Sequence, residues 1–190
     1  EWESIQGTFG FNYLLHENHS FGMRYDLLGR PRYTKRTIWE NEVQRNGAFY
    51  DRIHSDGLED ANYNPEHTLN AYYNGKAGEW GIDFNADYYR MKQDILTSTT
   101  EESQEEENRL VQATNPVENQ LAAAKVVFSH PLWGGEVSFG SEYTYTTRTD
   151  DYLSQSTEYV PTVYSKIREH NVAAFVEYAH SFSFGDIAVG

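Results

Sequence analysis

Apolar and polar residues alternate with a period of two over much of this chain. The clearest run covers residues 80–89, whose odd positions are almost all polar. Its even positions are Trp80, Ile82, Phe84, Ala86 and Tyr88. Because successive side chains of a strand point to opposite faces of a sheet, this alternation predicts a strand with one apolar and one polar face.

The same alternation recurs along the chain, whereas helix signals are scarce. The further segments are residues 9–15, 21–27, 69–73, 122–129, 137–145, 172–178 and 187–189. The pattern therefore predicts an all-β protein with about eight strands.

The connections between these segments alternate in length. Short connections lie at residues 16–19, 74–79, 130–135 and just before Gly185, and long ones at residues 29–66, 93–118 and 149–169. Antiparallel hairpins with short turns at one end and long loops at the other are typical of an up-and-down transmembrane β-barrel. The prolines fit this layout, because none of Pro31, Pro65, Pro116, Pro131 and Pro161 interrupts a predicted strand.

Composition narrows the class of protein. The chain has 190 residues, which suits a single β-barrel region over residues 1–190, and it has no Cys, which excludes a disulfide scaffold or a thiol nucleophile. No run of about 20 apolar residues is present, as a membrane-spanning helix would need. The formal net charge of −14 argues against a nucleic-acid partner, because such a surface repels phosphate backbones.

Aromatic residues make up 15% of the chain although hydrophobic residues make up only 38%. Trp and Tyr are favoured where hydrocarbon meets water. Trp80 and Trp133 fall at the short-turn end, and Tyr88, Tyr89, Tyr143, Tyr145 and Tyr152 fall towards the long-loop end. The alternative is that these aromatic residues fill the core of a soluble β-sandwich.

Three charged or histidine-containing segments could each form a binding site or simply be part of the protein surface. The acidic run at residues 101–107 suits a solvated, mobile loop better than a Ca²⁺ site. The cluster of Arg30, Arg32, Lys35 and Arg36 suits either lipid headgroup phosphates or an ordinary charged loop. His16 and His19 flank a turn without a third ligand nearby, so we predict no metal site.

The polar strand faces supply the candidate ligand-binding residues. These are Asp83, Asn85, Asp87 and Glu142, which we expect to line a wet interior. Asp83 and Asp87 lie too far apart along one strand for the close carboxylate pair of a retaining glycosidase. No GxSxG elbow or P-loop occurs, so we predict no catalytic residues, no cofactor and no enzyme activity.

Two blocks of sequence resemble a known family. They are residues 122–132, AAAKVVFSHPL, followed by Gly140, Glu142, Tyr143 and Tyr145, and residues 170–190, which begin HNVAAF. The strand at residues 21–26, FGMRYD, fits more loosely. These blocks are similar to strand–turn–strand segments of the outer-membrane β-barrels of TonB-dependent receptors from Gram-negative bacteria.

The resemblance implies a location in the outer membrane, contact with its lipid, and import of a nutrient through a barrel that encloses a plug domain and depends on the TonB system. No plug or TonB box is recognisable here, so we expect an internal piece of a larger barrel. Two alternatives stay open. One is a complete eight-stranded outer-membrane barrel with a structural or adhesive role. The other is a soluble secreted β-sandwich or lipocalin-like binding protein.

Overall fold

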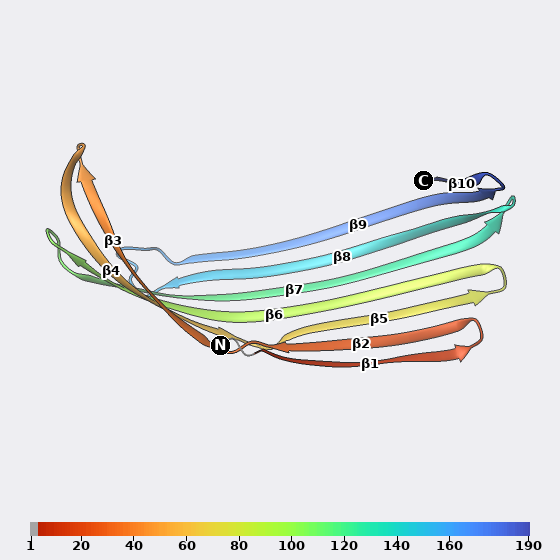
Figure 1. The fold of residues 1–190 in the computed structure, drawn as a ribbon, viewed down its shortest axis with the longest axis horizontal. Coiled ribbons are helices and arrows are strands. Elements are labelled where there is room, and N and C mark those ends of the chain that lie inside the picture. Colours follow the sequence, from red (N-terminus) through yellow and green to blue (C-terminus); the bar gives the residue numbers. More distant parts are fainter. Residues whose placement is uncertain (1–3) are drawn as a thin grey trace.

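The computed structural model describes residues 4–190, which form one antiparallel sheet of ten strands (Figure 1). The strands are β1 (Ile5–His16), β2 (His19–Gly29), β3 (Tyr33–Arg45), β4 (Ala48–Tyr63), β5 (Glu66–Ala77), β6 (Trp80–Ser103), β7 (Arg109–Leu132), β8 (Gly135–Ser154), β9 (Val163–Phe182) and β10 (Gly185–Val189). The prediction of an all-β, up-and-down antiparallel fold is confirmed, with ten strands instead of about eight. Within the described residues, β1 and β10 do not pair, so the sheet is open.

The strands follow one another along the sheet in the order β1-β2-β5-β6-β7-β8-β9-β10. The tight turns of the β1–β2, β5–β6, β7–β8 and β9–β10 hairpins all lie at one end, on the right in Figure 1. The asymmetry of short and long connections read from the sequence therefore describes a real difference between the two ends of the sheet.

The prediction of a long loop at residues 29–66 is wrong, because most of this segment forms the β3–β4 hairpin. This hairpin bends away from the other strands at the left of Figure 1. β4 pairs with the far half of β6 and β5 pairs with its near half, so β4 and β5 lie end to end along one strand. Pro65 separates them, and the backbone N–H of Asn64 still donates to Lys92 O at 3.0 Å.

The predicted loops at residues 93–118 and 149–169 are also largely strand. β6 and β7 each have 24 residues and pair over nearly their whole length. Both faces carry polar residues beyond Tyr89, so the period-two pattern that identifies a half-apolar strand disappears there. Within the last predicted loop only residues 155–162 lie between strands.

Two prolines lie inside β7, against expectation. Pro131 is opposite Glu136 near the end of the strand, and Pro116 lies where the β7–β8 ladder skips from Thr114 to Val117. A missing N–H is tolerated at such an irregularity. The side chain of Asn115 fills the gap by donating to Asp151 O at 2.8 Å.

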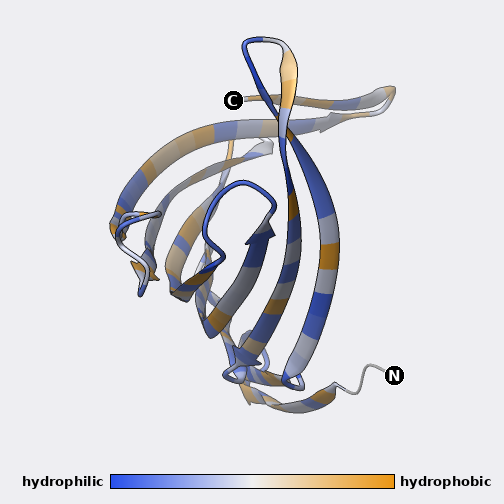
Figure 2. Cartoon of the chain, turned by 90° about the vertical axis from the view of Figure 1, so that its left-hand side faces the viewer, coloured by the Kyte–Doolittle hydropathy of each residue, from blue (hydrophilic) through white to orange (hydrophobic). Residues whose placement is uncertain are grey.

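Apolar and polar side chains alternate along β1, β2 and β5 and along the segments of β6 to β9 nearest the short turns, which gives this part of the curved sheet one apolar and one polar face. The alternation is visible as bands of colour in Figure 2. Register pairing joins the apolar faces of neighbouring strands into one surface. This apolar face includes Phe9, Phe11, Phe21, Met23, Leu69, Ala71, Ile82, Phe84, Ala124, Val126, Val137, Phe139, Val172 and Val176. Many of these side chains are exposed, including Phe84 at 37% and Val172 at 75%.

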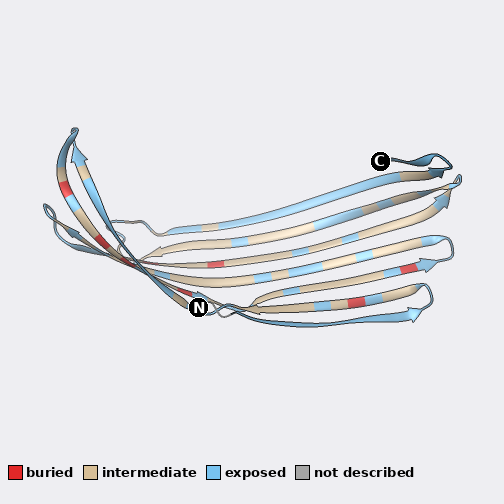
Figure 3. Ribbon diagram, in the orientation of Figure 1, coloured by how far each residue is buried: buried red, intermediate tan, exposed pale blue. Residues whose placement is uncertain are grey.

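Most of the buried residues belong to β4 and the adjoining part of β7 (Figure 3), where register pairing places them on the polar face of the sheet. They include Ser55, Ala61, Ala113 and Val117, which are at most 4% exposed. Side chains converge on the concave side of a curved sheet and diverge on its convex side, so this burial assigns the polar face to the concave side. The apolar face is therefore convex.

Aromatic rings lie over glycines on the concave face. A side chain at Gly140 would approach the ring of Phe175 to 2.7 Å, and one at Gly22 would approach Tyr72 to 2.5 Å. Trp39 covers Gly57 in the same way on the β3–β4 hairpin. Glycine weakens a strand unless a neighbouring side chain covers it, and these rings do so. Within the described residues the structure holds no helix long and apolar enough to cross a membrane.

The contact between Phe175 and Gly140 gives the first prediction. Gly140→Ala should lower the free energy of unfolding by about 1–3 kcal/mol, because the new methyl group would crowd the ring and Val126 O. Gly7→Ala is the matched control, since a Cβ at Gly7 would have nothing within 4 Å. Denaturant titration of the full-length protein measures both, and equal effects would contradict the packing described.

Candidate functional site on the polar face

The predicted ligand-binding residues all lie on the polar, concave face. Asp83, Asn85 and Asp87 follow one another on β6, and Glu142 lies on β8. In register, Asn85 is opposite Lys125 of β7, which is in turn opposite Glu142. The residues thus share a face, while β7 separates Glu142 from the other three.

Amide side chains bind the β6 carboxylates. Asp83 accepts hydrogen bonds from Asn85 Nδ2 at 2.6 Å and Asn74 Nδ2 at 3.2 Å, and Asp87 accepts one from Asn70 Nδ2 at 2.8 Å. The hydrogen-bond partners of both carboxylates are thus neutral amide groups. The arrangement can bind water, amides or cations, and it contains no nucleophile with an adjacent base.

Glu142 does not join this network. The Lys125 ammonium lies over the ring of Phe175, with Nζ 5.7 Å from the ring centroid, instead of forming an ion pair with Glu142. The structure therefore brings Asp83 and Asn85 into contact, whereas Asp87 binds Asn70 further along the same face and Glu142 lies apart from all three.

Sequence reasoning missed two further polar groups on this face. Arg24 and Thr8 both bind Asp26, with Arg24 Nε at 2.8 Å and Thr8 Oγ1 at 2.6 Å. Tyr72 donates from its hydroxyl to Asn12 Oδ1 at 2.9 Å. The alternation placed all these residues on polar faces, but only the strand order shows which of them meet.

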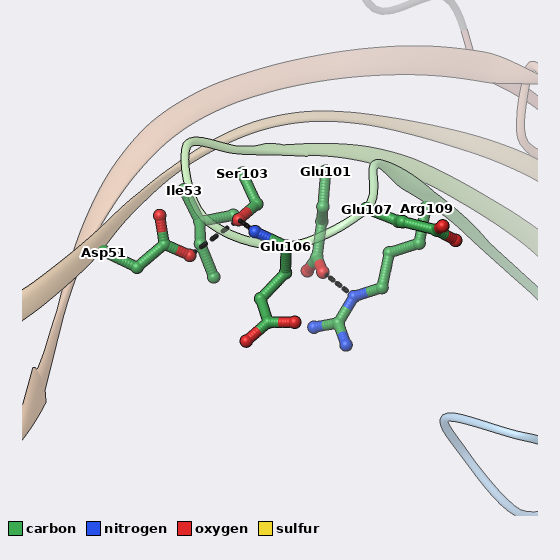
Figure 4. Close-up of a pocket in the computed structure, with 7 residues that line it drawn as sticks. All are labelled: Asp51, Ile53, Glu101, Ser103, Glu106, Glu107 and Arg109. Atoms are coloured by element: carbon green, nitrogen blue, oxygen red, sulfur yellow. Dashed lines mark hydrogen bonds and ion pairs between the residues drawn. The ribbon is translucent and has the colours of Figure 1, made fainter.

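The acidic run, which we expect to be a loop, begins inside β6 and continues into a hydrogen-bonded turn before β7 (Figure 4). The Asp51 carboxylate accepts hydrogen bonds from Ser103 Oγ at 2.7 Å and from the backbone N–H of Gln104 at 3.0 Å. Ser103 Oγ in turn accepts hydrogen bonds from the N–H groups of Glu105 and Glu106. Asp51 on β4 thereby caps the turn, and the hydrogen bond from Ser103 is the main cause that lowers the pKa of its carboxyl.

Two acidic side chains of this run have partners of their own. Glu101 forms an ion pair with Arg109, and Glu106 accepts a hydrogen bond from the hydroxyl of Tyr50 at 2.6 Å. Among residues 4–190 no group of three or more His, Cys, Asp and Glu side chains is arranged to hold a metal ion.

The arginines of the predicted basic cluster are bound to carboxylates. Arg30 pairs with Glu66 at 2.9 Å and Arg36 with Asp56 at 2.5 Å, and Arg32 pairs with Asp60. Each of these guanidinium groups is paired with a carboxylate within the protein. The cluster therefore fits an ordinary charged surface better than a site for lipid headgroup phosphates.

Histidines and tyrosines form pairs at both ends of the apolar face. At the short-turn end, His19 Nδ1 and the Tyr73 hydroxyl share a hydrogen bond of 2.6 Å. At the other end, His67 pairs in the same way with Tyr25 at 2.6 Å, and His170 with Tyr143 at 2.8 Å. Of the six other aromatic residues predicted at the two ends, Trp80, Tyr88 and Tyr145 lie on the apolar face and Tyr89 and Tyr152 on the polar face. Trp133 lies in the turn between β7 and β8.

Comparison with known proteins identifies a shared fold. No protein-family model and no curated protein matches the sequence. Among solved structures, the siderophore receptor PiuA from Acinetobacter baumannii is similar over 94% of this chain, with a TM-score of 0.52 and 12% identity. At this level of identity the likeness concerns the fold alone. The chain spans 30% of the length of PiuA.

A second solved structure, the ferric yersiniabactin uptake receptor FyuA from Yersinia pestis, aligns over 93% of this chain and 34% of its own length. Its TM-score is 0.27 and its identity 8%.

The cap formed by Asp51 gives the second prediction. Because its folded-state pKa is lowered, its contribution to stability is present above the unfolded pKa of about 4 and is lost as the pH falls through the folded value. Hydrogen exchange at Gln104 and Glu106, corrected for intrinsic rates, should therefore accelerate below about pH 4. Asp51→Asn should remove this pH dependence, whereas exchange in the β7–β8 turn should be the same in both proteins. A pH-independent turn in the unmodified protein would contradict the cap.

Proposed function

We propose that the chain is a β-barrel portion of an outer-membrane, TonB-dependent receptor that imports a nutrient. The observation that carries the proposal is the apolar face: it is continuous across β1, β2 and β5 to β9, no other described element covers it, and on β6 it stops after Tyr88, well before the strand ends. A water-soluble protein seldom exposes so large an apolar surface.

The height of the apolar face fits a bilayer. On β6 it extends from Trp80 to Tyr88, and Arg90 follows on the same face. This is about nine residues, which is the length that a tilted strand needs to cross the hydrocarbon core. Paired strands satisfy one another's backbone hydrogen bonds, so a sheet with this face is compatible with lipid.

Aromatic residues mark both limits of this height. The Trp80 ring lies 4.6 Å from that of His130 at the short-turn end, and the pairs His67–Tyr25 and His170–Tyr143 lie at the other. Such girdles are typical of outer-membrane barrels at the two levels where hydrocarbon meets water.

The open sheet supports the proposal that this region is a piece of a larger barrel. β10 pairs only with residues 178–182 of β9, so the far side of residues 163–177 has no partner strand among the described residues. A complete eight-stranded barrel would join its first and last strands, and a β-sandwich would cover the apolar face with a second sheet. Neither arrangement is present in residues 4–190.

The polar face would then line the lumen of that barrel. Asp83, Asn85, Asp87 and Glu142 are the residues that we assign to contact with a plug domain, with water or with the passing nutrient. The likeness to PiuA supports this function through the fold alone. We assign the chain no catalytic role, because Asp83 and Asp87 have amide partners and no nucleophile beside them.

The reading frame of the complete gene tests the receptor proposal. We expect it to encode a plug-like domain before this region and further strands after it. A gene that encodes this region alone would overturn the proposal and favour a small structural barrel.

The third prediction tests the direction in which the two faces point. In the full-length protein Phe84→Arg should destabilise the membrane-folded state by about 2–4 kcal/mol, because Phe84 lies near the middle of the apolar face. Thr144→Arg is the control, since Thr144 lies on the polar face between Ala123 and Asn171. Folding into lipid vesicles, followed by denaturant titration, measures both. A small effect of Phe84→Arg would show that this face does not contact lipid.

A further inference from the structure

A row of cations borders the apolar face at the end opposite the short turns. Register pairing aligns Arg90, Gln120, Thr147 and Arg168 across β6 to β9, just beyond Tyr88. One step further on the same face, it aligns Lys92, Glu118, Thr149 and Lys166. We call Arg90, Lys92, Lys166 and Arg168 the basic belt.

The charge of the belt is mostly uncompensated. Arg90 pairs with Glu118 at 2.9 Å, while Lys92, Lys166 and Arg168 form no ion pair with any described residue. Glu118 is the one carboxylate in the two rows, and Asp94 and Asp151 lie a further step away from the apolar face. Four cations against one carboxylate stand out in a chain of net charge −14.

The belt differs in this respect from the other cations on the same face. Arg36 and Arg52 of the β3–β4 hairpin pair with Asp56 and Glu42 at 2.5 and 2.8 Å. The hairpin charges are therefore neutralised within the protein, whereas those of Lys92, Lys166 and Arg168 are available to an external anion.

We infer that the basic belt binds the phosphate groups of anionic lipid headgroups. The inference rests on the proposed membrane location and assigns a ligand class to its boundary. The belt continues the apolar face directly, so a lipid whose chains lie against Ala122 and Tyr145 has its headgroup at the level of Arg90 and Arg168. The two ends of the belt are three strand spacings apart, about 14 Å, with the amide and hydroxyl donors of Gln120 and Thr147 between them.

Physical chemistry favours phosphate as the recognised group. Guanidinium and ammonium donors form strong, charge-assisted hydrogen bonds with phosphate oxygens. At an anionic membrane surface each Lys or Arg side chain strengthens binding about fivefold. Lipid also supplies what free phosphate lacks, namely apolar chains for the adjoining face.

The test compares two double variants of the full-length protein. Lys166→Gln with Arg168→Gln removes two unpaired belt cations, and Arg36→Gln with Arg52→Gln removes two paired hairpin cations. The probes are phosphatidylglycerol and phosphatidylcholine added to the detergent-solubilised protein, with the bound lipid counted by native mass spectrometry. Inorganic phosphate is the third probe, added as a competitor.

We expect phosphatidylglycerol to bind in preference to phosphatidylcholine, with an affinity that falls as salt rises. The belt variant should lose about 25-fold in affinity for phosphatidylglycerol, and the hairpin variant should lose little. Millimolar inorganic phosphate should not displace the lipid.

Equal binding of the two lipids, or equal losses in the two variants, would overturn the inference. Displacement of the lipid by millimolar phosphate would also overturn it, in favour of a free-phosphate site. Membrane assembly of the same variants is scored separately: a protein that assembles normally but has no preference for anionic lipid contradicts only the belt. A protein that never enters the membrane contradicts the proposed function.

Discussion

The structure depends on one constraint: every strand must satisfy its backbone hydrogen bonds through its neighbours while its two faces meet different surroundings. The antiparallel ladder of β5 to β9 meets the first requirement. The period of two meets the second, because each successive side chain changes face. A register slip of one residue between β6 and β7 would move Phe84 and Val126 to opposite faces, so the apolar face itself fixes the register.

The pattern of side chains changes where the two faces no longer need different surroundings. Beyond Tyr88 and Ala122, β6 and β7 continue with polar residues on both faces, and β4 takes the place of β5 beside β6. Stability there comes from backbone ladders, ion pairs such as Arg36–Asp56, and caps such as Asp51. The proposed receptor would carry this part of the sheet outside the membrane, with the basic belt at the boundary.

Sequence alone predicted the parts of the fold in which one face is apolar. It identified β1, β2, β5, the near half of β6, and the apolar segments of β7 to β9, because alternation is visible there. It missed β3 and β4, since residues 33–63 have no apolar alternation and only long-range pairing shows that they are strands. At the site, it placed Asp83, Asn85 and Asp87 on the correct face. The separation of Glu142 and the unpaired state of the belt depend on strand order, which composition does not encode.

The central claim is that alternate residues of β6 face lipid and then, past Tyr88, both faces meet water. Because the chain has no Cys, single substitutions to Cys at each position from Ile82 to Gln93, spin-labelled in the membrane-assembled full-length protein, test it directly. The account predicts that labels at Ile82, Phe84 and Ala86 are accessible to oxygen and shielded from a water-soluble relaxation agent. It predicts the reverse at Asp83, Asn85 and Asp87, and access to water at every position from Arg90 onwards. Water access without alternation between Ile82 and Tyr88 would contradict it.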